Sequence, residues 1–297
     1  MDFNTDTLEA VNAGIVTAFN QSLTGAETTY GRVAMTVRST SKANVYPKLS
    51  DIPGMRKWVG SRHVHRLESD GFVIQNDSYE NTIAVAVNDI ADDEIGLYSM
   101  LAAEFGQAAA ELPDELVWPQ LESGFTETHY DGQFFFDTDH PVEDENGNEQ
   151  SVSNFQGGSG AAWYLMDTRR VIMPIIFQDR LAAQIVAMTN LTDPNVFNLD
   201  ELQWGAKRRC ATGFGAWQLA FASKEPLTPE SYADAKAQMQ AMRGHKGRKL
   251  AMRPSLLVVG NSNESAAKEL LKIERKEGGA GNIHFNDVDL HVETRLS

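Results

Sequence analysis

The residues best suited to chemistry lie together in the segment Asp137-Thr138-Asp139-His140-Pro141. Two carboxylates and an imidazole within four positions could ligate a metal ion or relay protons. Metal sites normally recruit ligands from several elements of a fold, whereas this segment would supply all three from one stretch. The aromatic run before it, residues 130–136, is typical of packing and turning. We therefore expect the Asp and His side chains to satisfy local backbone groups.

Two further patterns have weaker claims to a site. His63-Val64-His65 could place two imidazoles on one face of a strand, but no third ligand is evident. The segment Leu256–Val259 leads through Gly260-Asn261-Ser262 into an expected helix, which is the outline of a phosphate-binding turn. It lacks both GxGxxG and GxxxxGK[ST], and the chain has no GxSxG or HExxH motif. We expect no catalytic residue, no cofactor and no metal ligand.

Composition excludes several classes of protein. The 297 residues include 41 acidic and 26 basic side chains, a formal charge of −15, which is unsuited to wrapping nucleic acid through a general basic surface. The single cysteine, Cys210, cannot form an intramolecular disulfide. No run of some eighteen apolar residues predicts a membrane span. The length allows two domains, or one domain with a large insertion.

The first third of the chain predicts a helix followed by an extended arm. Leu8, Val11, Ile15 and Phe19 have helical spacing within residues 7–20. Large apolar residues alternate in 33–37 and again in 81–87, as they do on half-buried strands. We interpret residues 33–87 as a two-stranded ribbon with an irregular tip. Because a long ribbon is marginally stable alone, it should pack against another subunit.

Two cationic stretches stand out in this acidic chain. The segment 53–67 contains four cations and no acid: Arg56, Lys57, Arg62 and Arg66. It is either a solvated loop or an arm that docks on acids of a neighbour, such as Asp92, Asp93 and Glu94 or Glu111, Asp114 and Glu115. The second stretch follows an expected helix and comprises Arg243, His245, Lys246, Arg248, Lys249 and Arg253. It either caps that helix or contacts an acidic neighbouring subunit.

The remaining pattern mixes helices and strands. The acids at 92–94 should open a long helix over about 92–111, and Pro113 should begin a second one that ends near Gly124. Strands are expected at 171–177, with Pro174 at an edge or bulge, and at 213–221. A helix is expected at 229–243. The last segment predicts a strand at 256–259, a helix capped by Ser262 and ended by Gly278-Gly279, and a strand at 288–292. This order predicts an α+β (mixed α/β) fold.

Several segments together resemble the major head subunit of Mu-like phages and prophages. The most specific is Tyr130-Asp131-Gly132-Gln133-Phe134-Phe135-Phe136-Asp137-Thr138-Asp139-His140-Pro141. The others, in chain order, are residues 33–37, 113–117, 174–178, 215–220 and 253–259. The resemblance implies structural roles for Tyr130, Asp131, Gly132, Phe135, Asp137, Asp139, His140 and Pro141.

The resemblance implies the tailed-phage major-capsid fold. Its parts would be an N-terminal arm at 1–32, an extended loop at 33–87, a peripheral domain with the spine helix at 88–128, and an axial domain with returning peripheral segments at 129–297. It further implies a shell of hexamers and pentamers that encloses double-stranded DNA without sequence-specific binding. Scaffold, protease, portal and decoration proteins would be separate partners, and no membrane is involved.

The expected location is the virion, after assembly in the bacterial host cytoplasm. Two alternatives remain open at this point: a metal-dependent hydrolase using Asp137, Asp139 and His140, and a nanocompartment subunit with the same fold.

Overall fold

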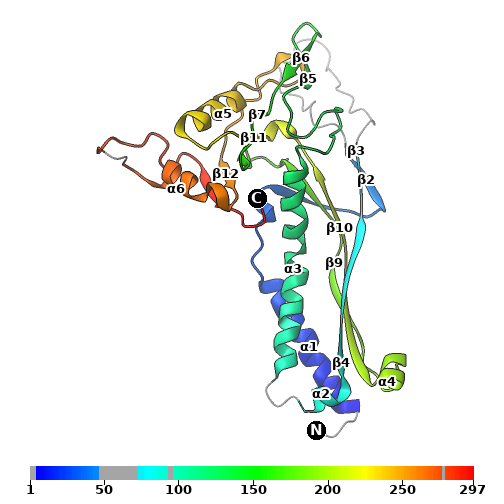
Figure 1. The fold of residues 1–297 in the computed structure, drawn as a ribbon. Helices are drawn as coiled ribbons and strands as arrows, with labels where there is room; N and C mark the ends of the chain where they lie inside the picture. Colours follow the sequence, from blue (N-terminus) through cyan, green and yellow to red (C-terminus); the bar gives the residue numbers. More distant parts are fainter. Residues whose placement is uncertain (1–4, 47–71, 93–95, 276–277) are drawn as a thin grey trace.

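The computed structural model describes residues 5–46, 72–92, 96–275 and 278–297 of an elongated molecule (Figure 1). We name its two regions after their positions in Figure 1. In the lower region, helices α1 (Thr5–Gly25) and α3 (Leu97–Ser123) run beside long strands. The upper region holds a second sheet with helices α5 (Pro229–Ala241) and α6 (Glu264–Lys272). Among the described helices, none combines the length and hydropathy required to cross a membrane.

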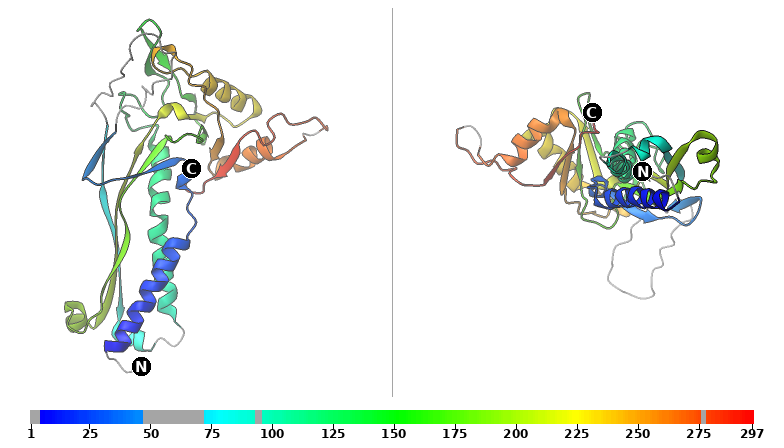
Figure 2. Two further views of the ribbon diagram at one scale, coloured as in Figure 1. Left: turned by 180° about the vertical axis from the view of Figure 1, so that it is seen from behind. Right: turned by 90° about the horizontal axis from the view of Figure 1, so that it is seen from below.

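The lower sheet has the strand order β1-β9-β10-β4 within the described residues. Its centre is a long antiparallel pair, β9 (Ile175–Met188) and β10 (Glu201–Phe214), joined at the lower end by a segment that contains α4 (Pro194–Leu199). Ile185 and Ala187 of β9 pack against residues of α1 and α3, so the helices cover one face of the sheet (Figure 2). Helix α2 (Val87–Ala91) lies at the same lower end.

The expected pairing between segments 33–37 and 81–87 is wrong. Strands β1 (Ala34–Arg38) and β4 (Asp77–Ala86) lie on opposite edges of the sheet, and β1 pairs with β9 in parallel while β4 pairs with β10 antiparallel. Within the described part of residues 33–87, β2 (Ala43–Tyr46) and β3 (Phe72–Gln75) pair as a two-stranded ribbon. Alternation shows that a strand has one buried face, but it does not identify the strand beside it.

The long helix also differs from expectation. It begins at Leu97 rather than near residue 92, because Asp92 instead ends the short helix α2. It then continues through Pro113 and Pro119 to Ser123, where two helices were expected. A proline inside a helix removes a hydrogen bond and costs about 3 kcal/mol. Here the turns around it bury Pro113, Val117, Trp118 and Leu121, and this packing offsets the cost.

The upper sheet has the described strand order β13-β12-β8-β11-β7. Its strands are β13 (Asp289–Val292), β12 (Leu256–Val259), β8 (Trp163–Met166), β11 (Ala220–Lys224) and β7 (Phe155–Gly158). The predicted strand–helix–strand unit is confirmed, since β12, α6 and β13 follow in order and the two strands pair in parallel. Helix α6 nevertheless follows η5 (Asn261–Asn263), so Ser262 is not its cap, and it ends at Lys272, before Gly278.

Two other expected elements shift. The strand expected at 171–177 begins at Ile175, directly after Pro174, and extends to Met188. The strand expected at 213–221 is interrupted, because β10 ends at Phe214 and η3 (Trp217–Leu219) precedes β11. Gly215 turns the chain there against the carbonyl groups of Met173 and Pro174, where a Cβ atom would clash. The helix expected at 229–243 is α5, which opens with a capping box at Thr228.

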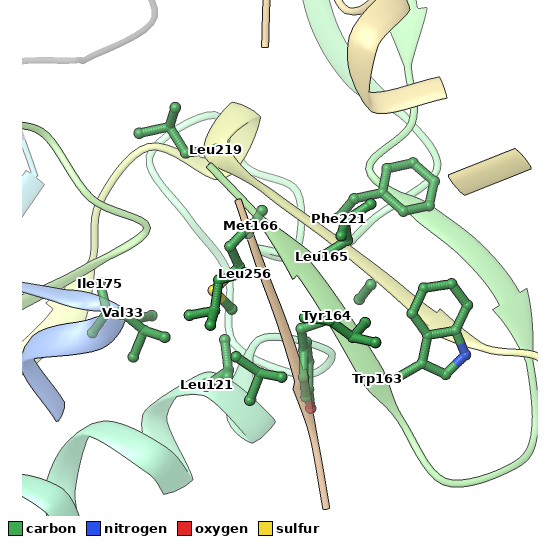
Figure 3. Close-up of a cluster of buried hydrophobic side chains, with 14 of the residues drawn as sticks. Val33, Leu121, Trp163, Tyr164, Leu165, Met166, Ile175, Leu219, Phe221 and Leu256 are labelled. Carbon is green, nitrogen blue, oxygen red and sulfur yellow. The ribbon is translucent and has the colours of Figure 1, made fainter. Parts of the chain in front are cut away.

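The main hydrophobic core fills the upper region and continues to the end of α3 (Figure 3). Every residue of β8 and β12 is buried. Leu121 of α3, Val33 before β1 and Ile175 of β9 pack against this sheet, as Figure 3 shows. One contiguous core therefore joins the upper sheet to the upper ends of the lower elements.

Candidate functional site

The motif at residues 130–141 is centred on the buried side chain of His140. Its imidazole Nδ1 lies 2.7 Å from Oδ2 of Asp131, and its ring stacks on the indole of Trp217 with centroids 3.8 Å apart. His140 is fully buried and begins β5 (His140–Glu143), which pairs with β6 (Glu149–Val152). The imidazole thus holds the start of this hairpin against the core.

Asn154 completes the environment of that imidazole. Its amide nitrogen donates toward the carbonyl groups of Phe135, Trp217 and Ala220, so its Oδ1 faces the opposite way and accepts from Nε2 of His140 at 3.1 Å. Both nitrogens of the His140 ring therefore lie within hydrogen-bond distance of a side-chain oxygen atom. These two contacts fix the imidazole between Asp131 and Asn154.

The other motif residues support the same packing. Burial raises the pKa of Asp131, but the hydrogen bond and the charge of His140 outweigh this effect and leave that pKa lowered. Gly132 has φ +86°, a left-handed conformation that suits glycine in the turn. Phe135 is fully buried and stacks on Phe214 with centroids 4.5 Å apart. Tyr130 stacks on Phe72 of β3 with centroids 6.0 Å apart.

The structure does not assemble the metal site that the hydrolase alternative requires. Asp137 accepts hydrogen bonds from the backbone N–H groups of Phe134 and Thr138, while Asp139 is exposed. Both nitrogens of His140 already have partners. No group of three metal-ligating side chains occurs among the described residues. Asp137 therefore makes the local backbone contacts that were expected, whereas the expectation is wrong for His140, which bonds to the side chains of Asp131 and Asn154.

The residues expected to contact a neighbour are only partly described. Arg56, Lys57, Arg62, Arg66, Asp93 and Glu94 lie outside the described residues, as do His63 and His65. Asp92 is exposed at the end of α2. Asp114 is 2% exposed and Glu111 lies 3.5 Å from Arg295 of the same chain, so both are engaged internally.

Asp114 belongs to a buried junction that the sequence did not reveal. Its carboxylate accepts hydrogen bonds from the backbone N–H groups of Thr29 and Tyr30 at 2.6–3.1 Å. The Thr29 hydroxyl also lies 3.1 Å from Glu293 and accepts a hydrogen bond from the indole of Trp118. The segment after α1, the middle of α3 and the segment after β13 therefore meet at one point.

The start of α3 and the segment around α4, both at the lower end of the molecule in Figure 1, carry many of the exposed apolar side chains. Of the fifteen large hydrophobic side chains exposed among the described residues, eight lie at the start of α3 or around α4: Leu97, Met100, Leu101, Val186, Met188, Leu191, Phe197 and Leu199. We call these eight residues the apolar tip. Exposed apolar side chains that gather at one end of a molecule are candidates for a subunit contact.

Comparison with known proteins places these features in a family. The family model described as "Mu-like prophage major head subunit gpT" matches residues 8–296. The chain is 39% identical over 296 residues to the Mu-like prophage FluMu major head subunit of Haemophilus influenzae, covering 97% of this chain and 96% of that protein. It is also 37% identical over 262 residues to the major capsid protein of Escherichia phage Mu, covering 86% of each.

Solved structures agree with this assignment. A chain from the procapsid of bacteriophage JBD30 superposes with a TM-score of 0.89 at 38% identity, covering 99% of this chain and 100% of that one. A chain from the capsid of the same phage gives a TM-score of 0.78 at 29% identity, with 94% of each chain covered. The fold is therefore that of a tailed-phage major capsid protein. The chain belongs to the Mu-like prophage major head subunit family, and its function is that of a major capsid protein of a phage head.

Proposed function

We propose that many copies of this chain, arranged as hexamers and pentamers, form a closed icosahedral shell around double-stranded DNA. The observation that carries the proposal is the match to the procapsid chain over 99% of this sequence. Assembly would take place in the cytoplasm of the bacterial host. The work of the protein is association with itself, and we assign it no catalytic residue and no cofactor.

The forces that hold such a shell are expected to be mainly apolar. An exposed ion pair contributes only about 0–1 kcal/mol, whereas an obligate interface buries more than about 2,000 Å². The apolar tip offers surface of the kind that such an interface needs. The negative charge of the chain is compatible with an inner wall that does not grip packaged DNA.

The parts of the chain would divide this work. We assign residues 1–32 to an N-terminal arm, 88–128 to a peripheral domain with α3 as its spine, and 129–297 to an axial domain with returning peripheral segments. Residues 33–87 would form an extended loop that reaches over a neighbour and whose strands β1 and β4 join the lower sheet. Scaffold, protease, portal and decoration proteins would act as separate partners. Support comes from the family membership and from the two regions of the fold.

The cations of the extended loop would contribute to a contact between subunits. We propose that Arg56, Lys57, Arg62 and Arg66 pair with Asp92, Asp93 and Glu94 of a neighbouring copy. The double variant Arg56→Glu/Lys57→Glu should lower the yield of shells, and adding Asp92→Lys/Asp93→Lys should restore it. Normal yield in the first variant would show that these cations are not part of a subunit contact.

The proposed function is tested by electron microscopy and sedimentation of particles produced with the complete set of head genes. Closed, uniform shells built from this chain are expected. A chain that stays monomeric, or forms only small oligomers with all head proteins supplied, would contradict the proposal.

A further inference from the structure

Two loops of the upper region bring seven cations together. The loop before β9 contributes Arg169 and Arg170, and the chain after α5 contributes the rest of the set, which we call the basic patch: Arg169, Arg170, Arg243, Lys246, Arg248, Lys249 and Arg253. All seven residues are exposed. Sequence spacing showed the cations after α5, but it gave no sign that residues 169 and 170 join them.

Hydrogen bonds fasten the two loops to each other. The guanidinium of Arg169 donates to the carbonyl oxygen of Arg253 at 2.9 Å, and that of Arg170 donates to the carbonyl oxygen of Leu250 at 2.8 Å. Within the second loop, Arg243 donates to the carbonyl oxygen of Gly247 at 2.9 Å. These contacts fix the position of the two loops relative to each other.

Few carboxylates offset that charge. The segments 168–171 and 243–253 contain no acid. Asp167, just before the first segment, is fully buried and pairs with Arg169 at 3.0 Å. Glu145 of the β5–β6 turn lies against Gly247. Asp167 also lies 3.5 Å from Arg170, so it offsets charge in the first loop. The segment 243–253 carries five cations and no acid, and their mutual repulsion is unfavourable unless negative charge comes from outside the segment.

The backbone of the second loop is held in strained conformations. Lys246 has φ +58° and Ala251 has φ +52°, and they are two of the four non-glycine residues with positive φ among those described. Left-handed backbone is unfavourable at a residue with a Cβ atom. Such strain persists where the surrounding structure enforces it, which is commonly at functional sites.

The charge of the rest of the chain identifies the partner. Seven of the 26 basic residues lie in the basic patch, while the chain carries 41 acids, so the remaining surface is strongly acidic. In a shell of identical chains, each copy therefore presents an acidic surface to its neighbours. Repulsion between such surfaces opposes assembly, and a concentrated cationic patch converts one contact into an attractive one.

We propose that the basic patch binds an acidic surface on a neighbouring copy of this chain, as a head-to-tail contact in which different surfaces of the two copies meet. The inference rests on the proposed assembly into a shell. The acidic surface that fits best is the flank formed by α5 and α6, with Asp234, Glu269 and Glu274 exposed. None of these three carboxylates has an ion pair within the described part of the chain.

The location of the basic patch favours a neighbouring copy over DNA. Lys246 of the basic patch lies in η4 (His245–Gly247), which contacts β5, a strand at the upper end of the elongated molecule (Figure 1). In a shell, the ends and edges of subunits meet their neighbours. Binding of packaged duplex would instead require cations spread along a broad face, because phosphates follow the whole length of the helix.

The test compares charge-reversed variants produced with the complete set of head genes. Lys249→Glu/Arg253→Glu should reduce shell yield about tenfold or more, since like charges across an interface cost several kcal/mol. Adding Asp234→Lys/Glu269→Lys should restore the yield. Lys42→Glu/Lys207→Glu makes the same change in charge at exposed positions elsewhere and should leave the yield near that of the wild type.

A variant that removes the charges without reversing them tests whether a lower shell yield is caused by misfolding. Lys249→Gln/Arg253→Gln should keep the thermal midpoint of the wild type, and its assembly should depend less on salt. Normal yield for the charge-reversed variant would overturn the inference, and so would normal shells that fail only to retain DNA, because the patch would then bind phosphate. Failure of the wild-type chain itself to form shells would instead contradict the proposed function.

Discussion

The upper and lower regions bury their residues in different ways. In the upper region, β8 and β12 are buried at every position, covered on both faces. In the lower region, β9 is buried only over its first four residues and then alternates between partly buried and exposed, because α1 and α3 cover a single face. The upper region completes its core within one chain. The lower region leaves apolar surface, including the apolar tip, for contacts between chains.

The largest expected effect is on the buried pair of His140 and Asp131 in the upper region. His140→Phe keeps the stack on Trp217 but leaves Asp131 and Asn154 without their imidazole partner. Breaking one partner of a buried pair costs about 3–5 kcal/mol, so the free energy of unfolding should fall by that amount in chemical denaturation.

The matched control for this change is Asp139→Asn, which alters an exposed acid of the same motif. Its free energy of unfolding should stay within about 0.5 kcal/mol of the wild type. A small effect of His140→Phe would show that the core of the upper region tolerates loss of this pair.

Lowering the pH should also reduce the stability of the upper region. Burial, opposed in part by the charge of Asp131, lowers the pKa of His129 to about 4. In the unfolded chain, His129 has a pKa near 6.5 and therefore binds a proton more readily than in the folded protein. Protonation thus favours unfolding: the folded protein keeps its full stability above pH 6.5 and loses stability as the pH falls toward 4. The loss should be about 3 kcal/mol by pH 4.

Denaturation from pH 7 to pH 4 checks this prediction. His129→Gln removes the titrating group and should flatten the pH dependence relative to the wild type. Equal pH dependence in both proteins would exclude His129 as its source. His291 at the buried junction also has a lowered pKa, owing first to burial, and should add a change of the same sign.

A third test addresses the close contact of α1 and α3 in the lower region. Gly106 of α3 lies so near Phe19 that an added Cβ atom would overlap its carbonyl group. Gly106→Ala should therefore destabilise the protein by about 1–3 kcal/mol, as overpacking does. Gly14→Ala is the control in α1, where the added methyl group meets no atom within 4 Å.

The control variant should change the stability of the protein in the opposite direction. Because alanine favours a helix over glycine, Gly14→Ala should stabilise the protein by about 0.5–1 kcal/mol in thermal denaturation. Destabilisation by both variants would mean that the helix pair, rather than its contact point, is sensitive to substitution.

The smallest effect on folding is expected at the apolar tip. Phe197 is 80% exposed, so Phe197→Ser should change the free energy of unfolding by no more than about 0.5 kcal/mol. It should nevertheless reduce the yield of assembled shells in sedimentation. Ile283→Ser, at an 86% exposed position of the upper region, is the control and should assemble normally. Equal yields for the two variants would remove the distinction between the regions.

Local sequence patterns predicted individual helices and strands better than they predicted which strands pair with each other. The strand at Leu256–Val259 and its parallel neighbour followed from an apolar run, a helical face and a final alternation, all within forty residues of sequence. The alternation at 33–37 and 81–87 likewise marked real strands. Their pairing could not be inferred, because the strands that separate them, β9 and β10, lie about a hundred residues or more away in sequence.

The buried polar contacts were predicted least well. The resemblance marked Asp131 and His140, but their partners Asn154 and Trp217 lie in other segments with no distinctive pattern around them. From the sequence, Asp114 was expected to be an exposed acid available to a neighbour. In the fold it is buried against the backbone of Thr29 and Tyr30. Pro113 suggested a helix start because propensity acts locally, while the continuous helix depends on tertiary packing.

The buried junction also constrains the order in which the chain can fold. Thr29 contacts Glu293, 264 positions later, and β1 pairs with β9 across some 140 residues. Such distant contacts form slowly, because a long loop must close before they stabilise anything. During synthesis, Asp114 and Thr29 leave the ribosome long before Glu293 does. A nascent or truncated chain therefore lacks one side of the junction, and only a chain translated through residue 293 can complete the subunit.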